Sequence, residues 1–158
     1  MEPVRWLTDE EQRAWRRLAA VVLRLPATLE RQLQRDAGMT HVEYRVLALL
    51  SEEPDGQLPL RRLAAQANAS LSRLSHVVTR LEERSWVVRQ PDPTDGRTTL
   101  AVLTEQGREV LVAAAPGHVA AVRSVVFEPL SERDVADLER IAGRIAARLD
   151  EPPATNNR

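Results

Sequence analysis

The sequence of 158 residues contains no cysteine and no lysine, and it has only three Trp, one Tyr and one Phe. The absence of cysteine excludes disulfides, thiolate zinc sites and a cysteine redox switch. With so few aromatic rings, the hydrophobic core must consist mainly of Leu, Val, Ile and Ala. A chain of this length fits one domain and can bury a core without cross-links.

Long apolar stretches are also missing. No uninterrupted apolar run approaches the ~18 residues of a membrane span. The N-terminus lacks the basic segment and apolar stretch that mark a secretory signal. We therefore expect a cytoplasmic protein with no membrane partner.

The motifs of enzymes and cofactor sites are absent as well. The sequence has no G-x-G-x-x-G, no P-loop and no G-x-S-x-G. His41, His76 and His118 lie far apart, with no pair at i, i+4 spacing and no carboxylate at ligand spacing. We predict no enzyme activity, no cofactor and no metal site.

The charges are unevenly distributed, although the formal net charge is only −1. Residues 60–97 carry seven Arg against four acidic residues, whereas residues 128–151 carry four Arg against seven acidic residues. A basic middle suits contact with phosphates, and the planar guanidinium also suits guanine edges. The alternative for any single Arg is genomic base composition.

Helix starts are marked by capping boxes at Thr8 and Thr40, with a weaker version at Ser131. Apolar stripes predict a helix after each of them. Pro26 predicts a kink or restart in the first helix, Gly38 its end, and Pro116-Gly117 a kink in a long helix over 104–127.

The middle of the chain predicts a helix-turn-helix followed by a β-hairpin. We expect short helices over 61–67 and 70–84, then strands around 86–89 and 98–103 joined by a turn-rich segment. This order is typical of a winged helix-turn-helix. The expected fold class is therefore mainly α with a small β-wing, plus helices outside the winged domain.

The outward face of the 70–84 helix suits reading of the major groove, where Arg bonds guanine edges and Ser or Thr bonds bases or phosphates. An ordinary solvated helix surface is the competing interpretation. The candidate DNA-binding residues on this helix are Ser70, Leu71, Ser72, Arg73, Ser75, His76, Thr79 and Arg80.

The hairpin adds three candidates. Arg97 follows the turn and suits insertion into the minor groove at the wing tip. Asp95 should not face phosphate directly, and we expect it to orient Arg97 or Arg89 by a charge-assisted hydrogen bond. Alternatively, Asp95 is a turn aspartate that bonds its own backbone.

These residues resemble the MarR family of bacterial transcription regulators over most of the chain, from about Asp9 to Leu149. The most specific mark is the wing pattern Asp-x-x-Asp-x-Arg followed by Leu-Thr-x-x-Gly. It is formed here by Asp92, Asp95, Arg97, Leu103, Thr104 and Gly107.

The resemblance implies a homodimer that binds a pseudo-palindromic operator in double-stranded DNA, usually as a repressor, at the nucleoid when bound. It implies a winged domain over 39–103 and a helical dimerisation region over 1–38 and 104–150. The 151–158 tail is expected to be disordered. Where the family usually has Gly after the recognition helix, this chain has Ser85. The missing cysteine separates it from the peroxide-sensing branch.

The resemblance also implies a small aromatic or anionic effector bound between the dimer helices and the winged domain. The candidates that line such a pocket are Trp15, His41, Tyr44, Arg45, His118 and Arg123. Each also has a structural interpretation, as a core, staple or surface residue.

A winged helix used only for protein contacts is the alternative function. Such an interaction module would share the fold but would not need Arg73, Arg97 or the local positive charge.

Overall fold

The computed structural model describes residues 4–150. The 151–158 tail, for which disorder is expected, lies outside the described residues. The chain divides into two compact units, Met1–His118 and Val119–Arg158. The first unit contains the winged domain.

The first two helices begin at the expected capping boxes. Helix α1 spans Asp9–Ala37 and helix α2 spans His41–Glu52. At each start the hydroxyl of the N-cap threonine accepts the N–H three residues on, and the glutamate there accepts the N-cap N–H at 2.8 Å. Gly38 ends α1 in the left-handed region with φ +62°. The capping boxes and the end of α1 are thus confirmed.

Of the kink or restart expected at Pro26, the restart is wrong, because α1 continues through this residue. Proline removes one donor from the helix ladder and disturbs one turn. A helix of 29 residues keeps its remaining hydrogen bonds on both sides of that turn. Helix α5 likewise continues through Pro116.

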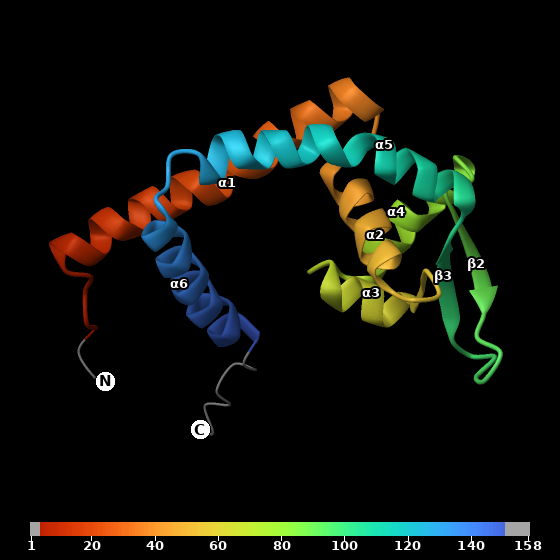
Figure 1. Cartoon of the computed structure of the whole chain (residues 1–158). Coiled ribbons are helices and arrows are strands. Elements are labelled where there is room, and N and C mark those ends of the chain that lie inside the picture. Colours follow the sequence, from red (N-terminus) through yellow and green to blue (C-terminus); the bar gives the residue numbers. More distant parts are fainter. Residues whose placement is uncertain (1–3, 151–158) are drawn as a thin grey trace, which may run out of the picture. The chain divides into compact units, whose positions relative to one another are not determined.

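The winged helix-turn-helix is confirmed (Figure 1). Its three strands form an antiparallel sheet in the order β1-β3-β2, with Val87 opposite Leu103 and Pro91 opposite Thr99. The elements are β1 Gln57–Pro59, α3 Leu60–Gln66, α4 Leu71–Glu83, β2 Val87–Pro91 and β3 Thr99–Leu103.

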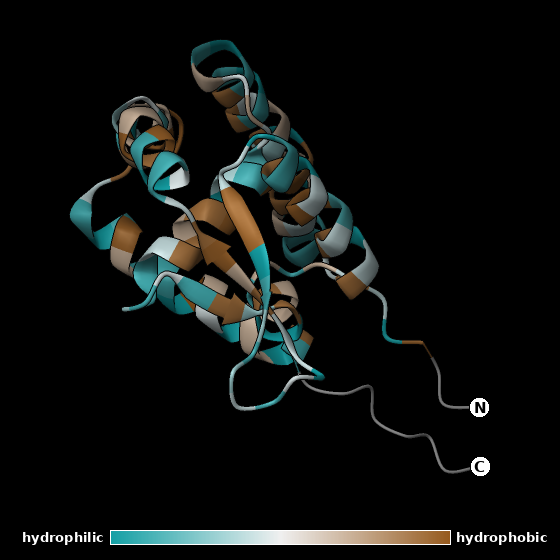
Figure 2. Cartoon of the chain, turned by 90° about the vertical axis from the view of Figure 1, so that its right-hand side faces the viewer, coloured by the Kyte–Doolittle hydropathy of each residue, from teal (hydrophilic) through white to brown (hydrophobic). Residues whose placement is uncertain are grey.

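The core of the first unit forms around the inward face of α4. The four apolar residues at helical spacing, Leu74, Val77, Val78 and Leu81, are all buried, as expected. They belong to the same hydrophobic cluster as the buried face of α2 and the sheet. Figure 2 shows hydrophobic strands that lead into a hairpin loop of hydrophilic and neutral residues.

A tight corner joins α4, the wing and α5 (Glu105–Val122). Ser85 has φ +60°, and its carbonyl accepts the Thr104 hydroxyl at 2.7 Å. That hydroxyl oxygen also accepts the Gly107 N–H at 3.0 Å, which caps α5. A Cβ on Gly107 would lie 2.1 Å from the Trp86 carbonyl oxygen. The Leu-Thr-x-x-Gly pattern therefore caps α5 and lets it approach the wing.

The second unit contains a π-helical turn, Arg123–Phe127, and helix α6, Glu132–Asp150. The Ser131 hydroxyl accepts the Asp134 N–H at 3.3 Å, and the Asp134 carboxylate accepts the Ser131 N–H at 3.0 Å. The weaker capping box is therefore also confirmed.

One helix bears on the expectation that no part of the chain spans a membrane. Among residues 4–150, the helix Glu105–Phe127 is long and apolar enough to cross a membrane by length and composition alone, with a mean hydropathy of 1.7. Polar residues such as His118 interrupt the apolar run of this helix, whereas its many Ala and Val residues keep the average hydropathy high. One such helix is weak evidence, because helices that pack in soluble proteins pass the same test.

The positive φ of Ser85 gives a first prediction. A side chain in the left-handed region costs roughly 1 kcal/mol, and glycine removes that cost. Ser85→Gly should therefore raise the free energy of unfolding by about 1 kcal/mol. Urea unfolding followed by circular dichroism measures the change, and an equal or lower stability would contradict it.

The close approach at Gly107 gives a second prediction. Gly107→Ala should lower the free energy of unfolding by about 3 kcal/mol or more, because backbone must move to admit the methyl group. The control is Gly96→Ala, where the added Cβ meets nothing within 4 Å. Equal effects of the two substitutions in urea unfolding would count against the packing described here.

Candidate nucleic-acid interface

The outward face of α4 is polar and open to solvent. Ser72, Arg73, His76, Thr79 and Arg80 are all exposed. Leu71 is 44% exposed, so it does not pack into the core. Ser70 is the N-cap, and its hydroxyl accepts the Arg73 N–H at 3.2 Å. The structure thus keeps most of the candidate residues on one accessible face.

The two arginines of this face differ in their contacts. Among the described residues, no ion pair involves the Arg73 guanidinium. By contrast, Arg80 donates its Nε–H to Glu43 Oε1 at 2.9 Å, and Glu43 is buried. Arg73 is therefore free to contact a ligand, whereas Arg80 is held at one edge of its guanidinium.

The carboxylate of Glu43 stays ionised although it is buried. Burial raises its pKa, but the Thr40 N–H and the Arg80 guanidinium favour the charged form, and the pKa lies below its usual value. This carboxylate joins the start of α2 to α4. Sequence reasoning identified Glu43 as part of a capping box and missed its contact with Arg80.

The wing tip presents Arg97 to solvent and is held by local hydrogen bonds. The Arg97 side chain is 99% exposed, and its Nε lies 3.8 Å from Asp95 Oδ1. Asp95 also accepts the Arg97 N–H at 3.1 Å and the Thr98 hydroxyl at 3.0 Å. Asp92 accepts the Thr94 N–H and hydroxyl, and these bonds lower the pKa of Asp92.

The expected role of Asp95 is therefore partly corrected. Asp95 lies beside Arg97, and it also bonds its own turn, as the alternative proposed. It does not pair with Arg89, because the Arg89 side chain turns toward α4 instead. There the guanidinium contacts Glu82, Ser75 and Thr79. Sequence reasoning missed Glu82, since no periodic pattern relates a helix residue to a residue of the following strand.

Two hollows flank the outward face of α4. One, of ≈730 Å³, lies beside α1 and α2 and is lined in part by Glu30, His41, Arg73, His76 and Arg80. The other, of ≈720 Å³, separates the start of α4 from the wing. The second has Leu71 and Ser75 on one side and Asp95 and Arg97 on the other.

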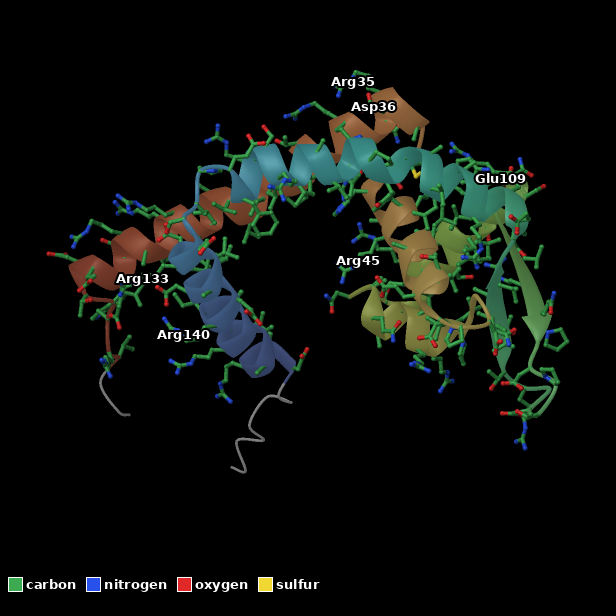
Figure 3. The ribbon with its side chains drawn as sticks, viewed as in Figure 1. Arg35, Asp36, Arg45, Glu109, Arg133 and Arg140 are labelled. Atoms are coloured by element: carbon green, nitrogen blue, oxygen red, sulfur yellow. The ribbon has the colours of Figure 1, made fainter. Side chains whose placement is uncertain are left out.

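Three of the six effector candidates come together. The ring of His118 lies 4.3 Å from that of Tyr44 and 5.7 Å from that of His41, measured between centroids. Its Nδ1 lies 3.3 Å from Gln32 Oε1, and Gln32 in turn donates to Asp36 at 3.0 Å. Figure 3 labels Asp36 near the C-terminal end of α1.

The other three candidates are not part of this cluster. Trp15 lies on α1 with 58% of its surface exposed. Arg45 projects from α2 on the side away from the wing (Figure 3), where it donates to the Gln66 carbonyl at 2.9 Å. Arg123 belongs to the second unit.

Comparison with known proteins places this site in context. A family model described as MarR family matches residues 37–98. Sco3205, a MarR family transcriptional regulator from Streptomyces coelicolor crystallised in complex with DNA, is 44% identical to this chain. The match covers 98% of this chain and 97% of that one, with a TM-score of 0.92.

Two further proteins are also similar. CouR from Rhodococcus jostii RHA1, bound to p-coumaroyl-CoA, is 30% identical over 82% of this chain and 88% of that one, with a TM-score of 0.72. The HTH-type transcriptional regulator MhqR of Bacillus subtilis is 32% identical over 62% of this chain and 66% of its own length. The alignments with MhqR and the other curated relatives span between 49% and 71% of either protein.

His118, which is buried, and His41, which is half-buried, give a prediction on pH. Burial disfavours the charged imidazole, so the pKa of His41 and that of His118 lie below 6.5. Each histidine then binds its proton more readily in the unfolded chain than in the folded one. The free energy of unfolding therefore decreases as the pH falls below 6.5. The urea concentration at the midpoint of unfolding should therefore be lower at about pH 5.5 than at about pH 7.5.

The His118→Asn variant should show a smaller fall in the midpoint, because it removes one of the two titrating rings. The control is His76→Asn, an exposed position, which should follow the wild type. A midpoint that rises on acidification, or equal behaviour of the two variants, would contradict the prediction.

Proposed function

The chain belongs to the MarR family of transcriptional regulators, and we propose that it binds a specific DNA sequence as a homodimer. Helix α4 lies in the major groove and the wing tip in the adjacent minor groove. The observation that carries the proposal is the presence of two solvent-exposed arginines, Arg73 on the outward face of α4 and Arg97 at the wing tip. An interaction module would not need either of them.

Each residue of this face has a chemical role in the proposal. Arg73 bonds a guanine edge, Ser72 and Thr79 bond bases or phosphates, and Leu71 touches a thymine methyl. His76 and Arg80 bond phosphates, and Arg97 enters the minor groove. Ser70 contributes as the N-cap that exposes the first turn of α4.

The homodimer is supported by apolar side chains that the chain leaves exposed. On α1 they follow helical spacing at Trp15, Leu18 and Val22, and on α6 at Leu138, Ile141 and Ile145. Exposed stripes of this kind mark protein interfaces. The dimerisation region is therefore assigned to 1–38 and 104–150, with the winged domain over 39–103 between them. In a two-fold dimer the half-sites lie about one helical turn apart.

A dimer seated on a promoter excludes other proteins from it, so repression is the expected mode. A small aromatic or anionic effector then releases the DNA. The ≈730 Å³ hollow beside α1 and α2 supports this part, since it shares Arg73 and His76 with the outward face of α4. A CouR structure holds p-coumaroyl-CoA, a large thioester. The neighbouring His41, Tyr44 and His118 supply rings for stacking, while Trp15, Arg45 and Arg123 are not part of that cluster.

The proposal is tested by fluorescence anisotropy with the purified protein, its own promoter region and a scrambled duplex, across a range of salt. Nanomolar binding that prefers the promoter and weakens steeply with salt is expected. If both duplexes bind equally weakly, selection from a random duplex library follows. Failure to enrich any sequence would overturn the proposal in favour of the interaction module.

The wing arginine gives a sharper prediction. Arg97→Ala should weaken binding about tenfold, while the dimer persists. The slope of log affinity against log salt concentration should also become shallower by about one. The control is Arg35→Ala, which removes the same charge at the end of α1, away from the wing (Figure 3). If both variants bind DNA equally well, the minor-groove role of Arg97 is wrong. Size-exclusion chromatography checks the dimer.

A further inference from the structure

Arg89, although a candidate for DNA contact, is the most extensively bonded arginine among the described residues of the winged domain. It lies in β2, at the base of the wing, and its side chain is 26% exposed. Its guanidinium NH1 group pairs with Glu82 Oε2, and its backbone N–H donates to Glu82 Oε1 at 3.0 Å. Both oxygens of one carboxylate on α4 therefore hold one residue of the wing.

The second arm of the guanidinium reaches one turn back along α4. Its NH2 group donates to the Ser75 carbonyl at 2.8 Å, and it lies 3.2 Å from the Ser75 hydroxyl and from the Thr79 hydroxyl. Arg89 therefore spans α4 from Ser75 to Glu82. Because both terminal nitrogens of Arg89 already bond protein acceptors, fewer of its N–H donors remain for a phosphate than at Arg80, where only Nε is bonded among the described residues.

Within residues 4–150, no hydrogen bond or ion pair ties the tip of the wing to α4. The ≈720 Å³ hollow separates Leu71 and Ser75 of α4 from Asp95 and Arg97 of the tip. The bonds of the tip are made within the hairpin, from Asp92 to Thr98. The direction in which the tip points therefore depends on how the base of the hairpin is fixed to α4.

We propose that the Glu82–Arg89 pair is a positioning device that fixes the angle of the wing relative to α4, so that Arg97 and Arg73 engage adjacent grooves of one duplex. Arg89 then acts through Arg97 and makes no DNA contact of its own. The inference rests on the proposed DNA-binding function. It assigns Glu82 a part in recognition although this acidic residue would repel phosphate.

The first test compares two acidic neighbours on α4. Glu82→Gln breaks the ion pair, and Glu83→Gln removes the same charge at an exposed position that has no hydrogen bond or ion pair to the wing among residues 4–150. The probe is a duplex that the wild-type protein has selected from a random library, and its affinity is measured by anisotropy. We expect Glu82→Gln to weaken binding about tenfold and Glu83→Gln to leave it unchanged or slightly tighter.

The sign of the Glu82→Gln effect separates the two roles of Arg89. If Arg89 bonds a phosphate directly, freeing it from Glu82 and removing a negative charge should tighten binding. Tighter or unchanged binding by Glu82→Gln would therefore overturn the proposal. Thermal unfolding of each variant shows whether the fold persists.

The second test is a double-mutant cycle between two residues that do not touch. Arg89→Lys keeps the charge but cannot bond Glu82 and the Ser75 carbonyl together, because an ammonium lacks the guanidinium fork. If the wing is misplaced in Arg89→Lys, adding Arg97→Ala should cost less than threefold in affinity, against about tenfold in the wild type. Additive effects of the two substitutions would contradict a positioning role, and a loss of stability alone would not produce coupling.

The controls keep the two proposals apart. If the wild-type protein selects no duplex, the DNA-binding function itself fails. If the wild type binds its selected duplex and Glu82→Gln behaves like Glu83→Gln, only the positioning role fails.

Discussion

The burial of one face of α4 is the constraint on which the winged domain depends. Leu74, Val77, Val78 and Leu81 are buried in the cluster shared with α2 and the sheet, and this fixes the rotation of the helix about its axis. The opposite face must then point outward with its serines, arginines and histidine. Hydrophobic packing thus decides which side chains a duplex can meet, and the polar contacts only refine their positions.

Much of the fold could be predicted because its signals are local. A capping box needs only residues three apart, so Thr8 and Thr40 mark the starts of α1 and α2 correctly. The stripe of α4 and the turn residues of the hairpin are equally short-range. The restart considered at Pro26 does not occur, because a single missing donor does not break a helix whose other turns are intact.

The site was less predictable, since its decisive contacts join elements through space. Nothing in the sequence relates Glu43 to Arg80 or Glu82 to Arg89, because each pair joins separate elements. Arg89 looked as suitable for phosphate as Arg97, and only the fold distinguishes the paired guanidinium from the open one. Likewise His41, Tyr44 and His118 meet, whereas Arg45 turns to a carbonyl of α3.

The self-contained bonding of the wing tip has a consequence for how such proteins diversify. Asp92 and Asp95 hold the loop through Thr94, Arg97 and Thr98, and the backbone closes it with Asp92 N–H to Thr98 O at 2.9 Å. The loop carries its own conformation, while in our proposal its direction is set by the Glu82–Arg89 pair at the base of the hairpin. Under the proposed function, sequence changes in the tip can therefore alter which minor groove it suits without disturbing the core. The conformation of the tip is thus independent of the packing of the rest of the winged domain.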